Sequence, residues 1–166
     1  MLFVHVLYLG KTTTAGRIAE LTGFTHIEVG ALIRDLKLYD SWNEEYDVSE
    51  FDEDKVCDEL EDRLAGGGNV VDFHSCDFMP ERWFQLVLVL RTDNTILWPR
   101  LKARGYSDKK CTLNVDAEIA QVCLDEAQSS WPEQMVIELT SDNAEQLESN
   151  AQRTVQWLEA YKKQHQ

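Results

Sequence analysis

Short apolar runs alternate along this chain with longer segments in which apolar residues recur at helical spacing. Asn69–Phe73 and Gln85–Leu90 are nearly continuous apolar runs, as expected for strands buried on both faces of a parallel sheet. Three further strands are predicted at Leu2–Leu9, His26–Val29 and Met135–Leu139. Helices are predicted over Lys11–Leu21, through Ile33 and Leu36, and over Asp54–Leu64, Asn94–Ala103, Val115–Ser129 and Ala144–Tyr161.

The order of these elements predicts the fold class. Five strands separated by helices indicate an α/β protein, with a five-stranded parallel sheet, right-handed crossovers and helices on both faces. Gly66-Gly67-Gly68 ends the helix before the third strand, and an acidic connector rich in aromatic residues precedes that helix. Because no repeat and no linker-like segment is visible, residues 1–166 are expected to form a single domain.

The composition fits a soluble globular protein, with 43% hydrophobic and 28% charged residues. No apolar stretch approaches the roughly 20 residues that a membrane-spanning helix needs. Met1–Leu9 is apolar, but it is short and lacks both a basic flank and a small-residue cleavage site. It is interpreted as a strand and not as a signal peptide, so an intracellular protein without membrane contact is expected.

The net charge of −14 argues against tight, direct binding of nucleic acid, which depends on basic residues that displace counterions from phosphates. Acidic runs at 43–47 and 50–54 are most simply solvated surface, and a basic protein is the alternative partner. The four cysteines form no C-x-x-C pair and are interpreted as free, buried thiols. They are Cys57, Cys76, Cys111 and Cys123.

The first candidate functional residues follow the end of the first predicted strand. Gly10-Lys11-Thr12-Thr13 follows that strand and opens a helix, which matches the second half of the phosphate-binding motif G-x-x-x-x-G-K-[ST]. The helix N-terminus offers N–H groups and a positive dipole end to an anion. Lys11 adds a charge for the β- and γ-phosphates of ATP, and Thr12 can bind Mg²⁺. A chance Gly-Lys-Thr at a helix start is the alternative interpretation.

The first half of this motif is absent. Its first glycine would fall at His5, and no glycine-rich turn precedes Gly10. Charge-assisted hydrogen bonds contribute about 1.5–3 kcal/mol each. The loss of two or three of them predicts ATP binding weakened by roughly 10²–10⁵-fold.

Two polar residues close the third predicted strand. Asp72 follows Val70-Val71, and a carboxylate at the carboxyl end of a strand can hold Mg²⁺ opposite the phosphate loop. A helix cap is the alternative for Asp72. His74 is expected to lie on the same side of the chain as Asp72, where it could position water, relay a proton or make a structural hydrogen bond.

Four arginines complete the candidate set. Arg34 and Arg82 are candidates for binding a phosphate group, because guanidinium groups bind phosphate in a bidentate manner. Arg100 and Arg104 lie one helical turn apart and can converge on the phosphate that is transferred. The alternatives are surface arginines and ion pairs on solvated helices.

From Gly10 to about Trp157 the chain resembles the adenylate kinase isoenzyme 6 family, atypical nuclear members of the P-loop nucleoside-monophosphate kinases. The most specific part of the resemblance is Val71–Phe84. The other matching segments are Val29–Arg34, Leu38–Asp40, Glu44–Asp47, Phe51–Asp54, Val89–Asp93, Arg100-Leu101, Arg104–Tyr106 and Lys109-Lys110. The resemblance implies a three-layer P-loop kinase fold with a monophosphate-binding region at 28–51 and a short lid at 103–113.

The resemblance also implies roles for individual residues. Residues 10–13 match the end of the ATP loop, Arg104 matches an ATP-contacting arginine, and Asp72 and His74 match an Asp-x-His signature that handles Mg²⁺ or water. With an adenylate kinase implied, Arg34 and Arg82 become the candidates for binding the phosphate of AMP. Members of the family transfer phosphate between ATP and AMP, hydrolyse ATP and assist maturation of the small ribosomal subunit in the nucleus. The resemblance therefore implies ATP and AMP as substrates, Mg²⁺, a basic small-subunit ribosomal protein as partner, and a location in the nucleus and also the cytoplasm.

The sequence departs from the family pattern at several positions. Besides the missing glycine turn, Ala31 stands where the family usually carries an acid, Asn143 where it often has a lysine, and Cys111 where the lid has an aliphatic residue. Three interpretations stay open: a working adenylate kinase and ATPase, an assembly factor that binds proteins but binds ATP poorly, and an N-terminus from an alternative or mispredicted first exon.

Overall fold

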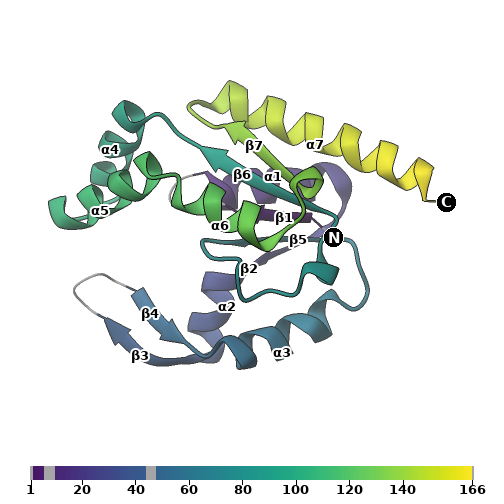
Figure 1. The fold of residues 1–166 in the computed structure, drawn as a ribbon, viewed down its shortest axis with the longest axis horizontal. Coiled ribbons are helices and arrows are strands. Elements are labelled where there is room, and N and C mark those ends of the chain that lie inside the picture. The colour runs from purple at the N-terminus through teal and green to yellow at the C-terminus, as the bar shows by residue number, and fades with distance from the viewer. Residues whose placement is uncertain (1, 6–9, 44–47, 166) are drawn as a thin grey trace.

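The central element of the fold is a sheet of parallel strands in the order β2-β5-β1-β6-β7 (Figure 1). The computed structural model describes the backbone of residues 2–5, 10–43 and 48–165, and the side chains of 10–41 and 50–165. The strands are β1 (Leu2–His5), β2 (Thr25–Glu28), β5 (Asn69–Phe73), β6 (Leu86–Arg91) and β7 (Val136–Thr140). Parallel strands between helices confirm the predicted α/β class.

Helices cover both faces of this sheet (Figure 1). α1 (Lys11–Thr22) and α7 (Ala144–Gln164) pack on one face, and α2 (Val29–Leu36), α3 (Glu53–Leu64) and α6 (Val122–Ser130) pack on the other. The strands are apolar on both sides for this reason. In β6, for example, Leu86, Leu88 and Leu90 face α1 and α7, whereas Val87 and Val89 face the opposite helices.

Two further helices, α4 (Asn94–Ala103) and α5 (Asp108–Ile119), form a smaller apolar cluster through Leu97, Leu101 and Cys111. Cys111 is fully buried there, so its thiol takes the place of the family's aliphatic side chain. Cys76 and Cys123 are also buried free thiols, as predicted, whereas Cys57 is half-buried.

The prediction of one helix over Val115–Ser129 is wrong. α5 already begins at Asp108, because the Ser107 hydroxyl accepts a hydrogen bond from the backbone N–H of Lys110 at 3.2 Å and caps the helix. Gln121 adopts a left-handed conformation (φ 58°) between α5 and α6. The predicted lid at 103–113 therefore contains the first half of α5.

The acidic connector also has structure that the sequence pattern did not predict. β3 (Tyr39–Asn43) and β4 (Val48–Phe51) pair as an antiparallel hairpin. Phe51 packs edge-to-face against Phe73 of the sheet, with ring centroids 5.4 Å apart. This contact joins residues distant in sequence, so local pattern could not reveal it. The last four residues of the first predicted strand, 6–9, lie outside the described residues.

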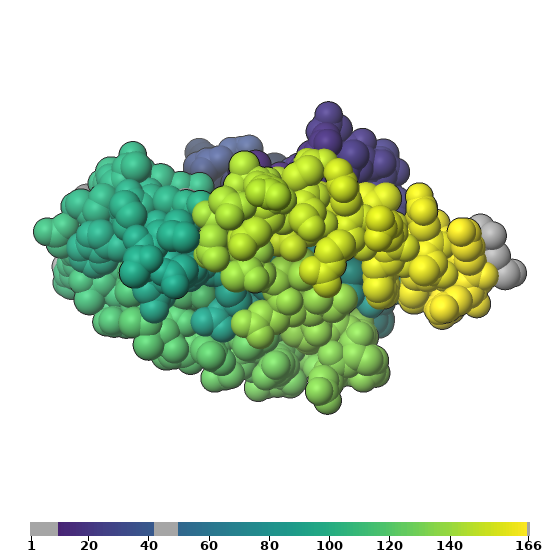
Figure 2. All heavy atoms as spheres, turned by 90° about the horizontal axis from the view of Figure 1, so that it is seen from above, coloured from purple at the N-terminus to yellow at the C-terminus, as the bar shows by residue number. Residues whose placement is uncertain are grey.

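The longest helix, α7, crosses the top of the molecule and extends past the rest of the body (Figure 2). It packs along α1 and is tied to it by Arg17, which binds both oxygens of Glu148 at 2.8 and 2.9 Å. Over the described residues, no helix combines the length and apolar character needed to cross a membrane.

Candidate functional site

The N-terminus of α1 meets the loop that follows β7. Gly10 precedes α1 with φ 96°, a left-handed conformation that favours glycine. A Cβ at Gly10 would also lie only 3.3 Å from Oγ of Ser141, which is buried. Both the backbone and the available space therefore require glycine at this position.

The spacing of the phosphate motif is retained although its first glycine is not. β1 ends at His5 and α1 begins at Lys11, so four residues separate His5 from Gly10, as in G-x-x-x-x-G-K. The predicted loss of the glycine-rich turn falls on residues 6–9, outside the described residues. The chain thus departs from the phosphate motif in residue type and not in the number of residues before Gly10.

Asp72 is the centre of the site. It lies on β5, is fully buried, and faces α1. One carboxylate oxygen, Oδ1, accepts a hydrogen bond from the Thr12 hydroxyl at 3.3 Å, and the other, Oδ2, contacts Nε2 of His26 on β2. The structure thereby brings the predicted pair Thr12 and Asp72 together from positions 60 residues apart, and adds His26, which the sequence did not single out.

The donor chemistry of this pair fits Mg²⁺. A hydroxyl and a carboxylate are hard oxygen ligands, and Mg²⁺ is commonly bound through one or two carboxylates together with substrate phosphates. Within the described part of the chain, no group of three or more His, Cys, Asp or Glu side chains could hold a metal ion. The hydroxyl of Thr12 and the carboxylate of Asp72 would hold such a metal, because both are hard oxygen ligands.

His74 lies at the bend directly after β5. Its ring packs against Phe73 at a centroid distance of 4.2 Å, and the residue as a whole stays exposed. Partial removal of the imidazole from water and the charge of Lys11 lower the pKa of His74 to about 4. The ring is therefore neutral at pH 7 and close to Lys11. His74 is exposed at this bend, whereas Asp72 is fully buried, and their expected shared side stays a prediction.

The loop after β5 is held by α6. The carboxylate of Glu126 accepts hydrogen bonds from the backbone N–H of Cys76 at 2.6 Å and from the Ser75 hydroxyl at 3.3 Å. Cys123 reaches the backbone oxygen of His74 with its thiol at 3.8 Å. Burial raises the pKa of Cys76 and Cys123 far above the usual range, so neither thiol is an available nucleophile.

Two of the predicted arginines have different surroundings. Arg34 lies on α2, and its side chain is 62% exposed, with Nε 3.6 Å from Oδ1 of Asp35. Arg82 lies on η1 (Glu81–Trp83) and pairs with Glu61 at 2.9 Å. Because η1 precedes β6, Arg82 lies toward the amino ends of the strands, away from Asp72. The structure does not bring Arg82 to the site, and its predicted AMP-binding role is corrected accordingly.

Arg100 and Arg104 also differ from the prediction. Arg100 donates hydrogen bonds to the backbone oxygens of Ser141, at 3.2 Å, and Asp142, so it fixes the loop that packs against Gly10. Arg104 is the exposed residue that follows α4. In this structure Arg100 therefore binds backbone carbonyls, and its convergence with Arg104 on a phosphate stays a prediction.

Arg91, at the end of β6, was not among the predicted site residues. Its Nε pairs with the carboxylate of Glu118, which is 7% exposed, and its Nη2 donates to the backbone oxygen of Glu118 at 3.0 Å. Burial raises the pKa of Glu118 while the ion pair with Arg91 opposes that change. A charged residue ending an apolar strand was the available signal. This pair anchors α5 to the sheet.

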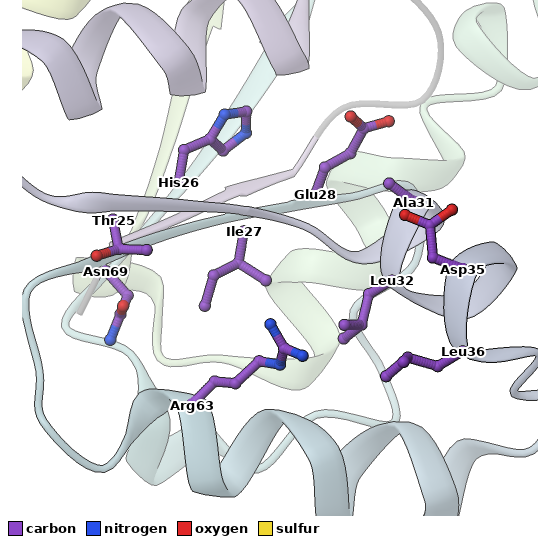
Figure 3. Close-up of a pocket in the computed structure, with 10 residues that line it drawn as sticks. All are labelled: Thr25, His26, Ile27, Glu28, Ala31, Leu32, Asp35, Leu36, Arg63 and Asn69. Atoms are coloured by element: carbon purple, nitrogen blue, oxygen red, sulfur yellow. The ribbon is translucent and has the colours of Figure 1, made fainter.

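A groove of about 470 Å³ runs along the outer side of β2 (Figure 3). We call it the β2 groove, and its lining residues come from β2, α2, α3 and β5. They are Thr25, His26, Ile27, Glu28, Ala31, Leu32, Asp35, Leu36, Arg63 and Asn69. His26 thus borders the groove and contacts the buried Asp72.

Comparison with known proteins agrees with this geometry. A family model described as an AAA domain matches residues 9–121. The chain is 47% identical to the adenylate kinase isoenzyme 6 homolog of Dictyostelium discoideum, covering 90% of this chain and 86% of that protein. It is 43% identical to the homolog of the same name from Schizosaccharomyces pombe, covering 94% and 89% respectively.

Solved structures share the fold at low sequence identity. Shikimate kinase from Bacteroides thetaiotaomicron superposes with a TM-score of 0.64 at 17% identity, covering 96% of this chain and 98% of that one. Dephospho-CoA kinase from Campylobacter jejuni superposes with a TM-score of 0.54 at 13% identity, covering 95% and 96%. Both are kinases by name, and the likeness shows a common fold.

Proposed function

Because the chain belongs to the adenylate kinase isoenzyme 6 family, we propose that it transfers the terminal phosphate of ATP to AMP and also hydrolyses ATP. The observation that carries this proposal is the contact between Thr12 and the buried Asp72 at the start of α1. In P-loop NTPases a hydroxyl and a carboxylate in this relation bind the metal that accompanies the triphosphate. Family membership alone would support a nucleotide kinase without indicating which residues act.

In the proposed mechanism the residues of the chain position and neutralise charge. Lys11 would contact the β- and γ-phosphates, and the N–H groups at the start of α1 would face the same oxygens. A bound Mg²⁺ would supply charge neutralisation at those phosphates when held by Thr12 and Asp72. His74, neutral and beside Lys11, would orient the attacking water during hydrolysis.

The acceptor side is assigned to Arg34. It lies on α2, directly after the carboxyl end of β2, with its guanidinium largely exposed and free to turn toward a phosphate. A guanidinium in such a place binds a monophosphate in a bidentate manner. Arg104, at the exposed end of α4, is proposed to contact ATP from the lid side.

A coupled assay that measures ADP formation tests the proposal directly. With ATP and AMP together the chain should form ADP, and with ATP alone it should release phosphate more slowly. Lys11→Ala should strongly lower the rates of both reactions. If the purified chain binds ATP but forms no ADP with AMP present, the kinase assignment is wrong.

The absent glycine turn supports a second candidate, an assembly factor that acts by binding proteins and binds ATP poorly. Calorimetric titration of the chain with ATP and Mg²⁺ separates the two. Binding in the micromolar range supports the kinase. A chain that captures a protein partner but shows no heat of ATP binding supports the assembly factor.

For either candidate, we propose a basic small-subunit ribosomal protein as partner and a nuclear and cytoplasmic location. The net charge of −14 favours a basic partner and speeds its association. Asp52 should not be altered in a test, because its side chain accepts the backbone N–H of Lys55 at 3.1 Å and caps α3. Reversal of Glu44, Glu45 and Asp54 to lysine should slow association with such a protein at low salt. Unchanged association kinetics, or tight binding of bare RNA, would contradict the proposal.

A further inference from the structure

The two oxygens of the Asp72 carboxylate have different partners. Oδ1 accepts a hydrogen bond from the Thr12 hydroxyl at the start of α1, and Oδ2 contacts Nε2 of His26. Asp72 is fully buried, so water cannot replace a partner that is removed. Each contact therefore restrains the orientation of the carboxylate.

The sheet brings His26 to Asp72 from the neighbouring strand. β2 pairs in parallel with β5, with His26 opposite Val70 and Glu28 opposite Asp72. Residues two apart on a strand point to the same side, so His26 shares the α1 face with Asp72. Figure 3 shows His26 and Ile27 on opposite sides of β2, and Ile27 belongs to the core on the far face. The imidazole thus reaches diagonally across one face of the sheet.

Helix α1 leaves space for this imidazole at Gly16. A Cβ on Gly16 would lie 3.7 Å from Nδ1 of His26, which is ordinary van der Waals contact, so a larger side chain would press on the ring. The side chain of His26 is 24% exposed, and His26 is one of the residues that line the β2 groove. The ring is therefore confined between α1 and Asp72 and still reaches the surface.

We propose that His26 is a positioning residue for the metal-binding carboxylate. Its ring nitrogen Nε2 donates a hydrogen bond to Oδ2 of Asp72, which leaves Oδ1 directed at Thr12 and the metal side. Residues that orient a metal ligand typically change metal affinity about 10–100-fold when removed. The proposal rests on the proposed function, which assigns Asp72 to Mg²⁺.

The first test compares ATP binding with and without the metal. Calorimetric titrations with ATP are run in Mg²⁺ and in EDTA, for the chain, His26→Phe and His26→Gln. In His26→Phe the gain in affinity from Mg²⁺ should fall by about 10–100-fold, while metal-free ATP binding stays unchanged. His26→Gln, whose amide can still donate, should keep most of that gain. His165→Phe, at the exposed end of α7, is the matched control.

The second test needs no nucleotide. Long-range ¹H–¹⁵N correlation spectra of the free protein report which ring nitrogen of His26 carries hydrogen. The expected result is hydrogen on Nε2, the ring nitrogen that contacts Oδ2 of Asp72. A ring with hydrogen only on Nδ1 would overturn the proposal. This second test uses the unaltered chain, so it remains decisive if His26→Phe does not fold.

The remaining outcomes separate this proposal from the proposed function. An equal loss of metal-free and Mg²⁺-dependent affinity in His26→Phe, or no loss of either, would overturn the positioning role. If the chain and a variant with a glycine-rich loop both fail to bind ATP, the proposed function is wrong. The spectrum of His26 then decides alone whether it is the donor to Asp72.

Discussion

The edge where α1 meets β5 and β2 differs from the surface that carries the predicted arginines in how its side chains are placed. Thr12, His26 and Asp72 converge because the backbone of two strands and one helix end sets their positions. We refer to these three residues as the metal edge. Of the arginines, Arg100 is held by backbone carbonyls and Arg82 pairs with an acid on α3. The residues of the metal edge are thus placed by β2, β5 and the start of α1, whereas the long side chains of Arg82 and Arg100 pair with groups on other elements.

This comparison separates sites that are already assembled from sites that require a substrate. The metal edge has its hydrogen bonds in the free chain, and Asp72 is fully buried there. Arg34 is 62% exposed, so a phosphate would have to draw its guanidinium into place. Four experiments test this difference between the metal edge and the arginines, and the one with the largest expected effect comes first.

The largest effect is expected from the loop before Gly10. A glycine-rich loop in place of residues 5–9 should strengthen binding of ATP with Mg²⁺ by roughly 10²–10⁵-fold, because two or three charge-assisted hydrogen bonds are restored. The existing spacing means that residues are replaced and none inserted. Calorimetry of both chains measures the change. Equal affinities would show that the metal edge suffices without the turn.

The next effect concerns the metal edge and its neighbour Lys11. Lys11→Ala and Asp72→Ala should each lower AMP phosphorylation and ATP hydrolysis by about 10²–10³-fold, because both reactions depend on the triphosphate and its metal. Rates of ADP and phosphate release measure this. Asp125→Ala, on the exposed side of α6, is the control and should leave both rates unchanged. Loss of only one reaction would contradict a shared triphosphate site.

A loss of stability is expected when Arg91 loses its buried partner Glu118. Glu118→Ala leaves Arg91 without its buried partner, which costs about 3–5 kcal/mol. For a chain of this length the midpoint of thermal unfolding should fall by roughly 6–20 °C. Glu138→Ala removes an exposed partner of Arg91, 3.2 Å away, and should change stability by only about 0–1 kcal/mol. Equal midpoints for the two variants would refute the anchoring role of Glu118.

The smallest effect distinguishes Arg34 from Arg82. Arg34→Ala should lower AMP phosphorylation by about 10–100-fold and spare ATP hydrolysis, because it removes one charge-assisted contact to the acceptor. Arg82→Ala should change neither rate, since Arg82 lies toward the other end of the sheet. Steady-state rates of both reactions measure the difference. Equal losses of both reactions in Arg34→Ala would remove its assignment.

The hydrophobic pattern predicted the strands of the sheet. The phosphate motif and the resemblance predicted Thr12 and Asp72 of the metal edge. β5 and α4 have the predicted bounds, Asn69–Phe73 and Asn94–Ala103. The hairpin at 39–51 and the break between α5 and α6 were missed. Both depend on contacts that a short window of sequence does not contain, namely Phe51 against the sheet and a left-handed Gln121.

The sequence alone was enough to locate the buried strands, and to place Thr12 at the start of a helix and Asp72 near the end of a strand, because apolar runs and motif spacing are local features. Only the tertiary structure decided that His26 contacts Asp72, that Arg100 binds the loop after β7, and that Arg82 lies elsewhere. The physical reason is that hydrogen-bonding groups are satisfied by whatever the folded chain brings within reach. That reach is set by strand order and helix packing, which no single segment encodes.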